Sequence, residues 1–82
     1  MPLITMVYFA QAREAAGRSS ERLELAGNPK VAEAFSKALS LHPGLKKIEK
    51  VVKIAVNEEL TSENVSLHDG DRVALLPPVA GG

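Results

Sequence analysis

One long amphipathic helix with a boundary signal at each end is the feature that most constrains the fold of this 82-residue chain. Asn28-Pro29 predicts a helix start, with Asn as the N-cap and Pro at the first helical position. Pro43-Gly44 breaks a helix, so the helix must stop near His42. Between these limits, apolar residues recur at helical spacing on one face: Val31, Phe35, Ala38 and Leu39.

The segments on either side of this helix have the composition of β-strands. Residues 3–9 are rich in β-branched and aromatic side chains and almost continuously apolar, which predicts a central strand covered on one face. Residues 20–25 alternate between apolar and charged side chains, and we expect them to pair with that first strand. Residues 51–56 and 72–76 are predicted to be the third and the last strand.

Short connections join these elements. Residues 11–16 contain helix-forming residues and end at Gly17, which predicts a short helix with a glycine stop. Asn57-Glu58-Glu59 fits a tight turn before Leu60, and His68-Asp69-Gly70-Asp71 is a strong turn signal. The order of elements predicts an α+β domain over residues 1–76, a mixed sheet with one main crossing helix, followed by a tail at 77–82.

Composition excludes several classes of function. The chain contains no cysteine, so disulfides, thiolate metal sites and a cysteine nucleophile are ruled out. Ten basic and ten acidic side chains cancel, which argues against bulk binding of nucleic acid. No apolar run approaches the length of about 20 residues that a membrane span needs. The first residues lack the basic region of a signal peptide, so we expect no membrane association and a cytoplasmic location.

The charges are unevenly distributed along the chain. Six lysines and two glutamates lie between Lys30 and Lys53, whereas five acidic residues and no Lys or Arg lie between Glu58 and Asp71. Two interpretations remain open. Both segments are solvated surface, or the acidic segment forms a face that docks on a basic partner.

Side chains that could form an active site are not evident in the sequence. His42 and His68 have no second ligand at metal-binding spacing and are expected to be surface histidines, so no metal site is predicted. Asp69 and Asp71 lack the rest of a calcium loop and are expected to form the turn. Nucleophile-elbow and phosphate-loop patterns are absent. We therefore expect no side-chain active site in this chain, and catalytic groups would come from a partner.

The tail offers a different kind of reactive group. Pro77-Pro78 favours extended backbone, and the six residues up to Gly81-Gly82 span about 20 Å when extended. A terminal Gly-Gly would place an α-carboxylate on a slender, flexible stalk that a partner's narrow channel can admit. An ATP-using enzyme could adenylate that carboxylate. A sulfur donor could then form a thiocarboxylate, or a lysine amine could form an amide.

Three stretches of the sequence resemble a known family. They are residues 8–14 (YFAQARE), Val56-Asn57 before a turn, and residues 69–82 (DGDRVALLPPVAGG). Together they resemble the MoaD family, the small sulfur-carrier subunits of molybdopterin synthase. The resemblance covers the whole length, and the ending with its two prolines and two glycines is its most specific part.

The resemblance implies a ubiquitin-like β-grasp fold and a role as sulfur carrier without catalytic side chains of its own. It implies adenylation of Gly82 by a MoeB-type enzyme that consumes ATP, and conversion to a thiocarboxylate by a sulfur donor protein. The tail would then enter a MoaE-type large subunit and donate sulfur to cyclic pyranopterin monophosphate, in a heterotetramer of two small and two large subunits. No cofactor bound to this chain is implied.

The resemblance also assigns residues. Gly82 would carry the sulfur, and an inserted arm would consist of Gly81, Ala80, Val79, Pro78 and Pro77. An apolar docking surface would be formed by Phe9, Leu60 and Leu76, although relatives often have an aromatic residue at the position of Leu76. For these three residues, packing in the core of a small sheet is the alternative.

Other functions remain open at this stage. A sulfur carrier of the thiamine pathway would share the fold and the terminal chemistry, but such proteins are usually shorter and lack Pro-Pro before the tail. A ubiquitin-like modifier would attach Gly82 to lysines of target proteins. A plain β-grasp interaction domain would have an inert tail, so removing Gly81-Gly82 would not alter its function.

Overall fold

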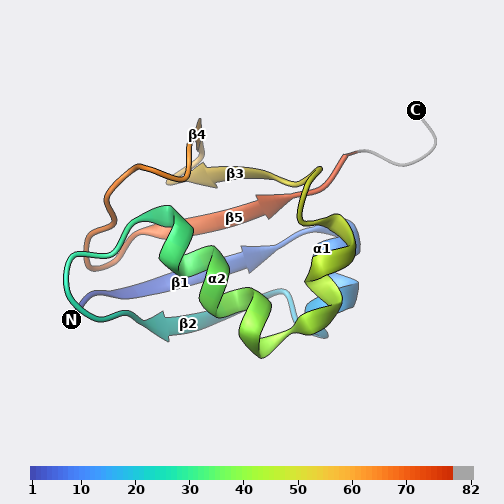
Figure 1. The fold of residues 1–82 in the computed structure, drawn as a ribbon, viewed down its shortest axis with the longest axis horizontal. Coiled ribbons are helices and arrows are strands. Elements are labelled where there is room, and N and C mark those ends of the chain that lie inside the picture. Colours follow the sequence, from blue (N-terminus) through green and yellow to red (C-terminus); the bar gives the residue numbers. More distant parts are fainter. Residues whose placement is uncertain (79–82) are drawn as a thin grey trace.

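A five-stranded mixed sheet, crossed on one face by helix α2, forms the frame of the molecule (Figure 1). In the computed structural model the structure describes residues 1–78. The elements are β1 (Leu3–Tyr8), α1 (Ala10–Ala16), β2 (Ser20–Glu24), α2 (Val31–Leu41), a 3-10 helix η1 (Pro43–Ile48), β3 (Lys53–Val56), β4 (Glu59–Thr61) and β5 (Arg72–Leu76). The predicted α+β architecture is therefore confirmed.

The strand order is β2-β1-β5-β3-β4, which places the first and last strands side by side in the middle of the sheet. β1 and β5 run parallel, with Met6 opposite Val73 and Tyr8 opposite Leu75. The other three pairings are antiparallel. Parallel neighbours need a long crossover, and α2 is part of the chain that makes it.

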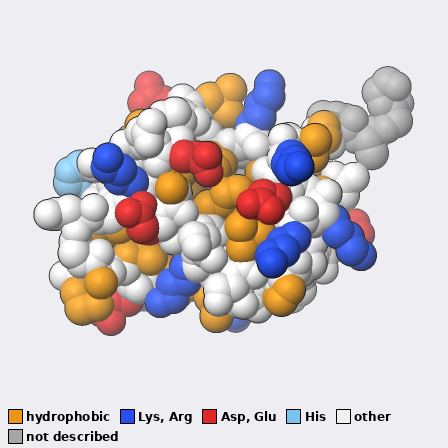
Figure 2. Space-filling model, viewed as in Figure 1, with side chains coloured by type: hydrophobic (Ala, Val, Ile, Leu, Met, Phe, Trp, Pro, Cys, Tyr) orange, Lys and Arg blue, Asp and Glu red, His pale blue; other side chains and the backbone are white. Residues whose placement is uncertain are grey.

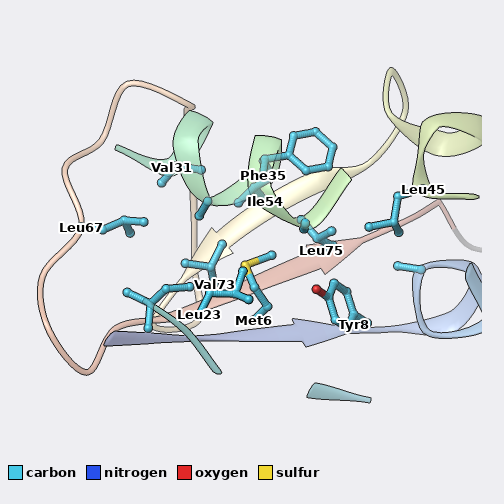
Figure 3. Packing of buried hydrophobic residues seen from close by; sticks show 14 of the residues in the cluster. Met6, Tyr8, Leu23, Val31, Phe35, Leu45, Ile54, Leu67, Val73 and Leu75 are labelled. Atoms are coloured by element: carbon cyan, nitrogen blue, oxygen red, sulfur yellow. The ribbon is translucent and has the colours of Figure 1, made fainter. Parts of the chain in front are cut away.

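The core lies between α2 and the inner face of the sheet (Figure 3). Alternate residues of β1 are buried, as the predicted covering of one face requires. From the helix, Val31, Ala34, Phe35 and Ala38 complete the packing. The largest fully buried side chains are Tyr8, Ile4, Met6, Leu45, Leu75, Val31, Val73 and Pro29. Within residues 1–78, no helix is long and apolar enough to cross a membrane.

Helix α2 begins later than the sequence predicts. Its N-cap is Lys30, in extended conformation, and Asn28-Pro29 precede the helix. The reason is a non-local bridge between Lys30 and Ser66. In this bridge the Pro29 carbonyl accepts from Leu67 N–H (2.9 Å) and Val31 N–H donates to the Val65 carbonyl (2.9 Å). The Glu33 carboxylate accepts from Lys30 N–H at 3.1 Å and closes the first turn.

Two further sequence predictions need correction. The third strand begins at Lys53, not at residue 51, because Val51 N–H and Val52 N–H both donate to the Ile48 carbonyl and prolong the turn after η1. The strand β4 is also missing from the predicted order of elements. It has three residues with no buried side chain among them, so it lacks the alternation that marks a strand. The short helix, its stop at Gly17 and the end of α2 at His42 are confirmed.

A polar cluster closes one end of the core. The Tyr8 hydroxyl donates to Glu21 Oε2 (2.5 Å), and His42 Nε2 lies 2.6 Å from the same oxygen. Arg18 Nη1 donates to Glu21 Oε1 at 3.1 Å. The ring of His42 also meets Tyr8 edge-on, with centroids 5.7 Å apart. The prediction that His42 is a surface histidine is therefore wrong, since its partners come from two distant strands. His68 is a surface histidine as predicted.

Electrostatics in this cluster favour the charged form of Glu21. Burial raises the pKa of its carboxyl, but hydrogen bonds from Tyr8 and His42 outweigh that effect, and the net pKa lies below its ordinary value. Burial, together with the bond to Glu21, raises the pKa of Tyr8 and keeps its hydroxyl protonated as a donor. The cluster thus holds β1, β2 and the end of α2 together through one carboxylate.

We expect Glu21→Gln to lower the free energy of unfolding at pH 7 by about 2 kcal/mol, because hydrogen bonds to a partly buried charge are lost. A lowered folded-state pKa gives stability that is present above the unfolded value, near 4.5, and disappears as pH falls through the folded value. The difference in the free energy of unfolding between wild type and variant should therefore become smaller in acid. Denaturant titrations from pH 7 to pH 3 measure it, with Glu24→Gln on the same strand as control. A gap independent of pH would contradict this account.

Candidate functional site

The outer face of the sheet, opposite α2, carries a transverse row of apolar residues. The register places Val7 beside Ala74, Ala74 beside Ala55, and Ala55 beside Leu60, so the row crosses four strands. Neighbouring residues in a register share a face of the sheet. Two alanines in the middle and larger side chains at the ends leave a depression between β1 and β4.

This depression is a hollow of about 250 Å³. We call it the outer-face hollow, and it is lined by Val7, Phe9, Ala55, Glu58, Leu60, Arg72, Ala74 and Leu76. Its lining is mostly apolar. On β2, beyond the end of the row, the residue opposite Val7 is the polar Ser20. An exposed apolar depression of this kind on a small sheet is typical of a surface that binds another molecule.

A second hollow, of about 580 Å³, begins where the first one ends. It is lined by Phe9, Ala10, Gln11, Glu14, Leu76, Pro77 and Pro78. Phe9 and Leu76 belong to both hollows, so the outer-face hollow continues to the point where the chain leaves the sheet. This arrangement follows from the pairing of Tyr8 with Leu75, because the next residue of each strand then lies at the same edge.

The sequence-predicted residues are placed as follows. Phe9 and Leu60 are 47% and 65% exposed and lie outside the buried core, which argues against the core-packing alternative for both. Leu76 is half-buried beside Phe9, and Pro77 and Pro78 follow directly. Their role in docking stays a prediction. Val79, Ala80, Gly81 and Gly82 lie outside the described residues.

Sequence reasoning missed five residues of the outer-face hollow: Val7, Ala55, Glu58, Arg72 and Ala74. Each stands at an outward position of its strand or turn. Alternation along β1 and β5 could have indicated Val7, Arg72 and Ala74 as outward, since their neighbours are buried. Ala55 is itself buried, so only the strand register shows that it forms the floor.

The turn Asn57-Glu58 is fastened to the start of β5. Asn57 N–H donates to the Arg72 carbonyl (2.8 Å), and Asn57 Oδ1 accepts from Arg72 N–H (3.0 Å). Asn57 Nδ2 donates to Asp71 Oδ1 at 3.0 Å. The hydrogen bonds from His68 N–H and from Asn57 lower the pKa of Asp71 and keep it ionised. The expected role of Asp71 as a turn former is confirmed by these bonds, and they fix one wall of the hollow.

Charges on the opposite face do not form a patch of one sign. Figure 2 shows the face that carries α2, where Lys and Arg side chains alternate with Asp and Glu around an apolar centre. Separation of charge along the sequence therefore does not produce separate basic and acidic areas on this face.

Comparison with known proteins decides the family. The model of the ThiS family matches residues 6–82. The chain belongs to the ThiS family. Two relatives with curated names match nearly the whole chain. The molybdopterin synthase sulfur carrier subunit of Chlamydomonas reinhardtii is 33% identical over 81 residues, which are 96% of this chain and 98% of that protein. The Escherichia coli (strain K12) subunit of the same name is 35% identical over 89 residues, covering 98% of this chain and 100% of that protein.

Solved structures show the same fold. SAMP1 from Haloferax volcanii superposes with a TM-score of 0.87 at 27% identity, covering 98% of this chain and 99% of that chain. A second match is a chain in the complex of subunits 1 and 2 of molybdopterin-converting factor from Helicobacter pylori 26695. It superposes with a TM-score of 0.72 at 28% identity, covering 98% of this chain and 99% of that chain. The predicted ubiquitin-like β-grasp fold and the resemblance to molybdopterin synthase sulfur carrier subunits are thus confirmed.

The side-chain hydrogen bonds of Asn57 are expected to contribute to the stability of the fold. We expect Asn57→Ala to lower the free energy of unfolding by about 1–2 kcal/mol, because two side-chain hydrogen bonds are lost and Ala tolerates a positive φ less well. Asn64→Ala, an exposed turn position without such bonds, is the control and should change stability by less than about 0.5 kcal/mol. Equal effects of the two substitutions in urea denaturation would contradict the assigned role.

The two faces of the sheet should respond differently to substitution. Leu60→Ser is expected to change the free energy of unfolding by less than about 0.5 kcal/mol, because Leu60 is exposed. Leu75→Ala, on the inner face, should cost about 2–5 kcal/mol because it opens a cavity in the core. Thermal and urea denaturation measure both values. A large loss for Leu60→Ser would assign that residue to the core.

Proposed function

We propose that this chain is the sulfur-carrier subunit of a molybdopterin synthase and that Gly82 is its reactive residue. The observation that carries the proposal is the continuity of the outer-face hollow with Pro77 and Pro78. An apolar hollow that reaches the base of the tail is what a docking surface for the tail's partner would require. Full-length similarity to molybdopterin synthase sulfur carrier subunits in distant organisms supports it.

The chemistry begins at the α-carboxylate, which Gly82 must carry as a free group. A MoeB-type enzyme would join it to the AMP part of ATP, forming a mixed anhydride and releasing pyrophosphate. A donor at the oxidation level of sulfide would then attack the acyl carbon, expel AMP and leave a thiocarboxylate. The two terminal glycines have no side chains to obstruct this attack.

The docking surface would deliver this thiocarboxylate to the place where it reacts. The complex of subunits 1 and 2 of molybdopterin-converting factor from Helicobacter pylori supports a large, MoaE-type subunit as the partner. Phe9, Leu60 and Leu76 would bury apolar surface against it, while the arm from Pro77 to Gly82 enters its active site. There the sulfur would pass to cyclic pyranopterin monophosphate, within an assembly of two small and two large subunits.

Intact-mass measurement tests the proposal. After incubation with a MoeB-type enzyme, ATP and a sulfur donor, the chain should gain the mass that replaces one oxygen by sulfur, on Gly82. Addition of the large subunit and the pterin precursor should remove that gain. The chain lacking Gly81-Gly82 should gain nothing but still bind the large subunit, because the outer-face hollow is intact.

Two results would contradict this function. A mass ladder on lysines of other proteins, with no sulfur transfer, would indicate the protein-modifier function for which SAMP1 is named. No mass change, under conditions in which the Escherichia coli subunit is modified, would indicate an interaction domain with an inert tail.

A further inference from the structure

The outer-face hollow has two chemically different ends. Phe9 and Leu76 form the end next to the tail, and both are apolar. Glu58 and Arg72 line the other end, where the β3–β4 turn meets the start of β5. Arg72 and Leu76 are the first and last residues of one strand, so the two ends are about 13 Å apart.

Neither charge at the remote end is neutralised by the described part of this chain. The ion pairs within residues 1–78 are Arg18–Glu21, His42–Glu21 and His68–Asp71, and none involves Glu58 or Arg72. Both residues are exposed. A positive and a negative side chain therefore border an apolar depression without being paired to each other or to a neighbour.

Glu58 occupies a position that does not suit its side chain. It is the second residue of a two-residue hairpin turn, with φ of 73°, and Asn57 before it has φ of 51°. Such turns strongly favour Asn-Gly, because glycine alone adopts the left-handed region without strain. Here the Asn is present, but Glu stands where Gly is favoured. Strained backbone positions cluster at functional sites, so Glu58, beside the hollow, is a candidate for a functional role.

The hydrogen bonds of Asn57 fix this Glu next to Arg72. They join the turn to the N–H and carbonyl groups of Arg72 itself. The backbone positions that carry the two charges are therefore fixed relative to the apolar floor of the hollow, formed by Ala55 and Ala74. Two opposite charges at one end of an apolar surface favour one orientation of the molecule that binds there.

We propose that Glu58 and Arg72 are specificity-determining residues of the outer-face hollow. They select a protein partner whose apolar surface fills the hollow and which presents a basic side chain to Glu58 and an acidic one to Arg72. This inference rests on the proposed function, and the partner to which it commits is the large synthase subunit. A partner with the charges exchanged, or without them, leaves both residues desolvated and unpaired, which disfavours its binding.

Charge reversal tests the inference against a matched control. Arg22 and Arg72 both lie opposite Thr5 on the outer face, but Arg22 belongs to β2 and does not line the hollow. We expect Arg72→Glu and Glu58→Lys each to weaken binding of the large subunit about tenfold at low salt, because like charges then face each other. The loss should shrink as salt rises. Arg22→Glu should alter the Kd by less than about twofold, and isothermal titration calorimetry measures all four proteins.

Glu58→Gly separates a functional role from a structural one. Removing the strain should raise the midpoint of urea denaturation, while loss of the charge should weaken binding of the large subunit about threefold. Stability and affinity would then change in opposite directions. A more stable variant with unchanged affinity would overturn the role of Glu58.

The remaining outcomes are distinct. If Arg72→Glu binds as tightly as Arg22→Glu, the specificity role is overturned although the proposed function stands. If the purified chain forms a dimer that Arg72→Glu dissociates, the hollow is occupied by a second copy and the committed partner is wrong. If the wild-type chain fails to bind the large subunit at all, it is the proposed function that fails.

Discussion

The parallel pairing of β1 with β5 is the constraint on which the rest of the molecule depends. It joins the first strand to the last one and encloses the crossover that contains α2. Because Tyr8 pairs with Leu75, Phe9 and Leu76 reach the same edge of the sheet together. The point where the tail leaves is thus fixed by the same hydrogen bonds that order the core, and a shift of register would move both.

A single sheet then serves two purposes through the alternation of its strands. Inward residues of β1 and β5 pack under α2, while outward residues of the same strands form the outer-face hollow. In a domain this small the core is thin, so an exposed apolar surface competes with the core for apolar residues. Ala55 and Ala74 reduce that competition, since their small side chains form an apolar floor that uses little apolar surface.

Local patterns in the sequence predicted most of the fold, and non-local contacts account for what they missed. The helix periodicity and the apolar composition of residues 3–9 depend only on near neighbours, and both predictions are confirmed. The start of α2 was misplaced because its first turn is set by a bridge to Ser66. Likewise, the sequence around His42 gives no sign that its side chain is largely buried, since its partner Glu21 lies far away in the sequence, on β2.

The candidate site was predicted in a different way. Phe9, Leu60 and Leu76 came from a resemblance, and the structure brings all three to one hollow. Alternation along β5 indicates that Arg72 faces outward, but its position beside Glu58 at one end of the hollow follows only from the fold. A spatial relation between residues that are distant in the sequence, such as Glu58 and Arg72, cannot be predicted from a sequence pattern.

The central claim is that the outer-face hollow and the tail act together on one partner, the large synthase subunit. Backbone amide NMR of the labelled chain, with and without that subunit, tests it most directly. The account predicts that amide signals of Val7, Phe9, Leu60 and Ala74 shift or broaden on binding, together with those of the tail, while signals from the exposed side of α2 stay in place. Perturbations confined to α2, or to the tail alone, would contradict it.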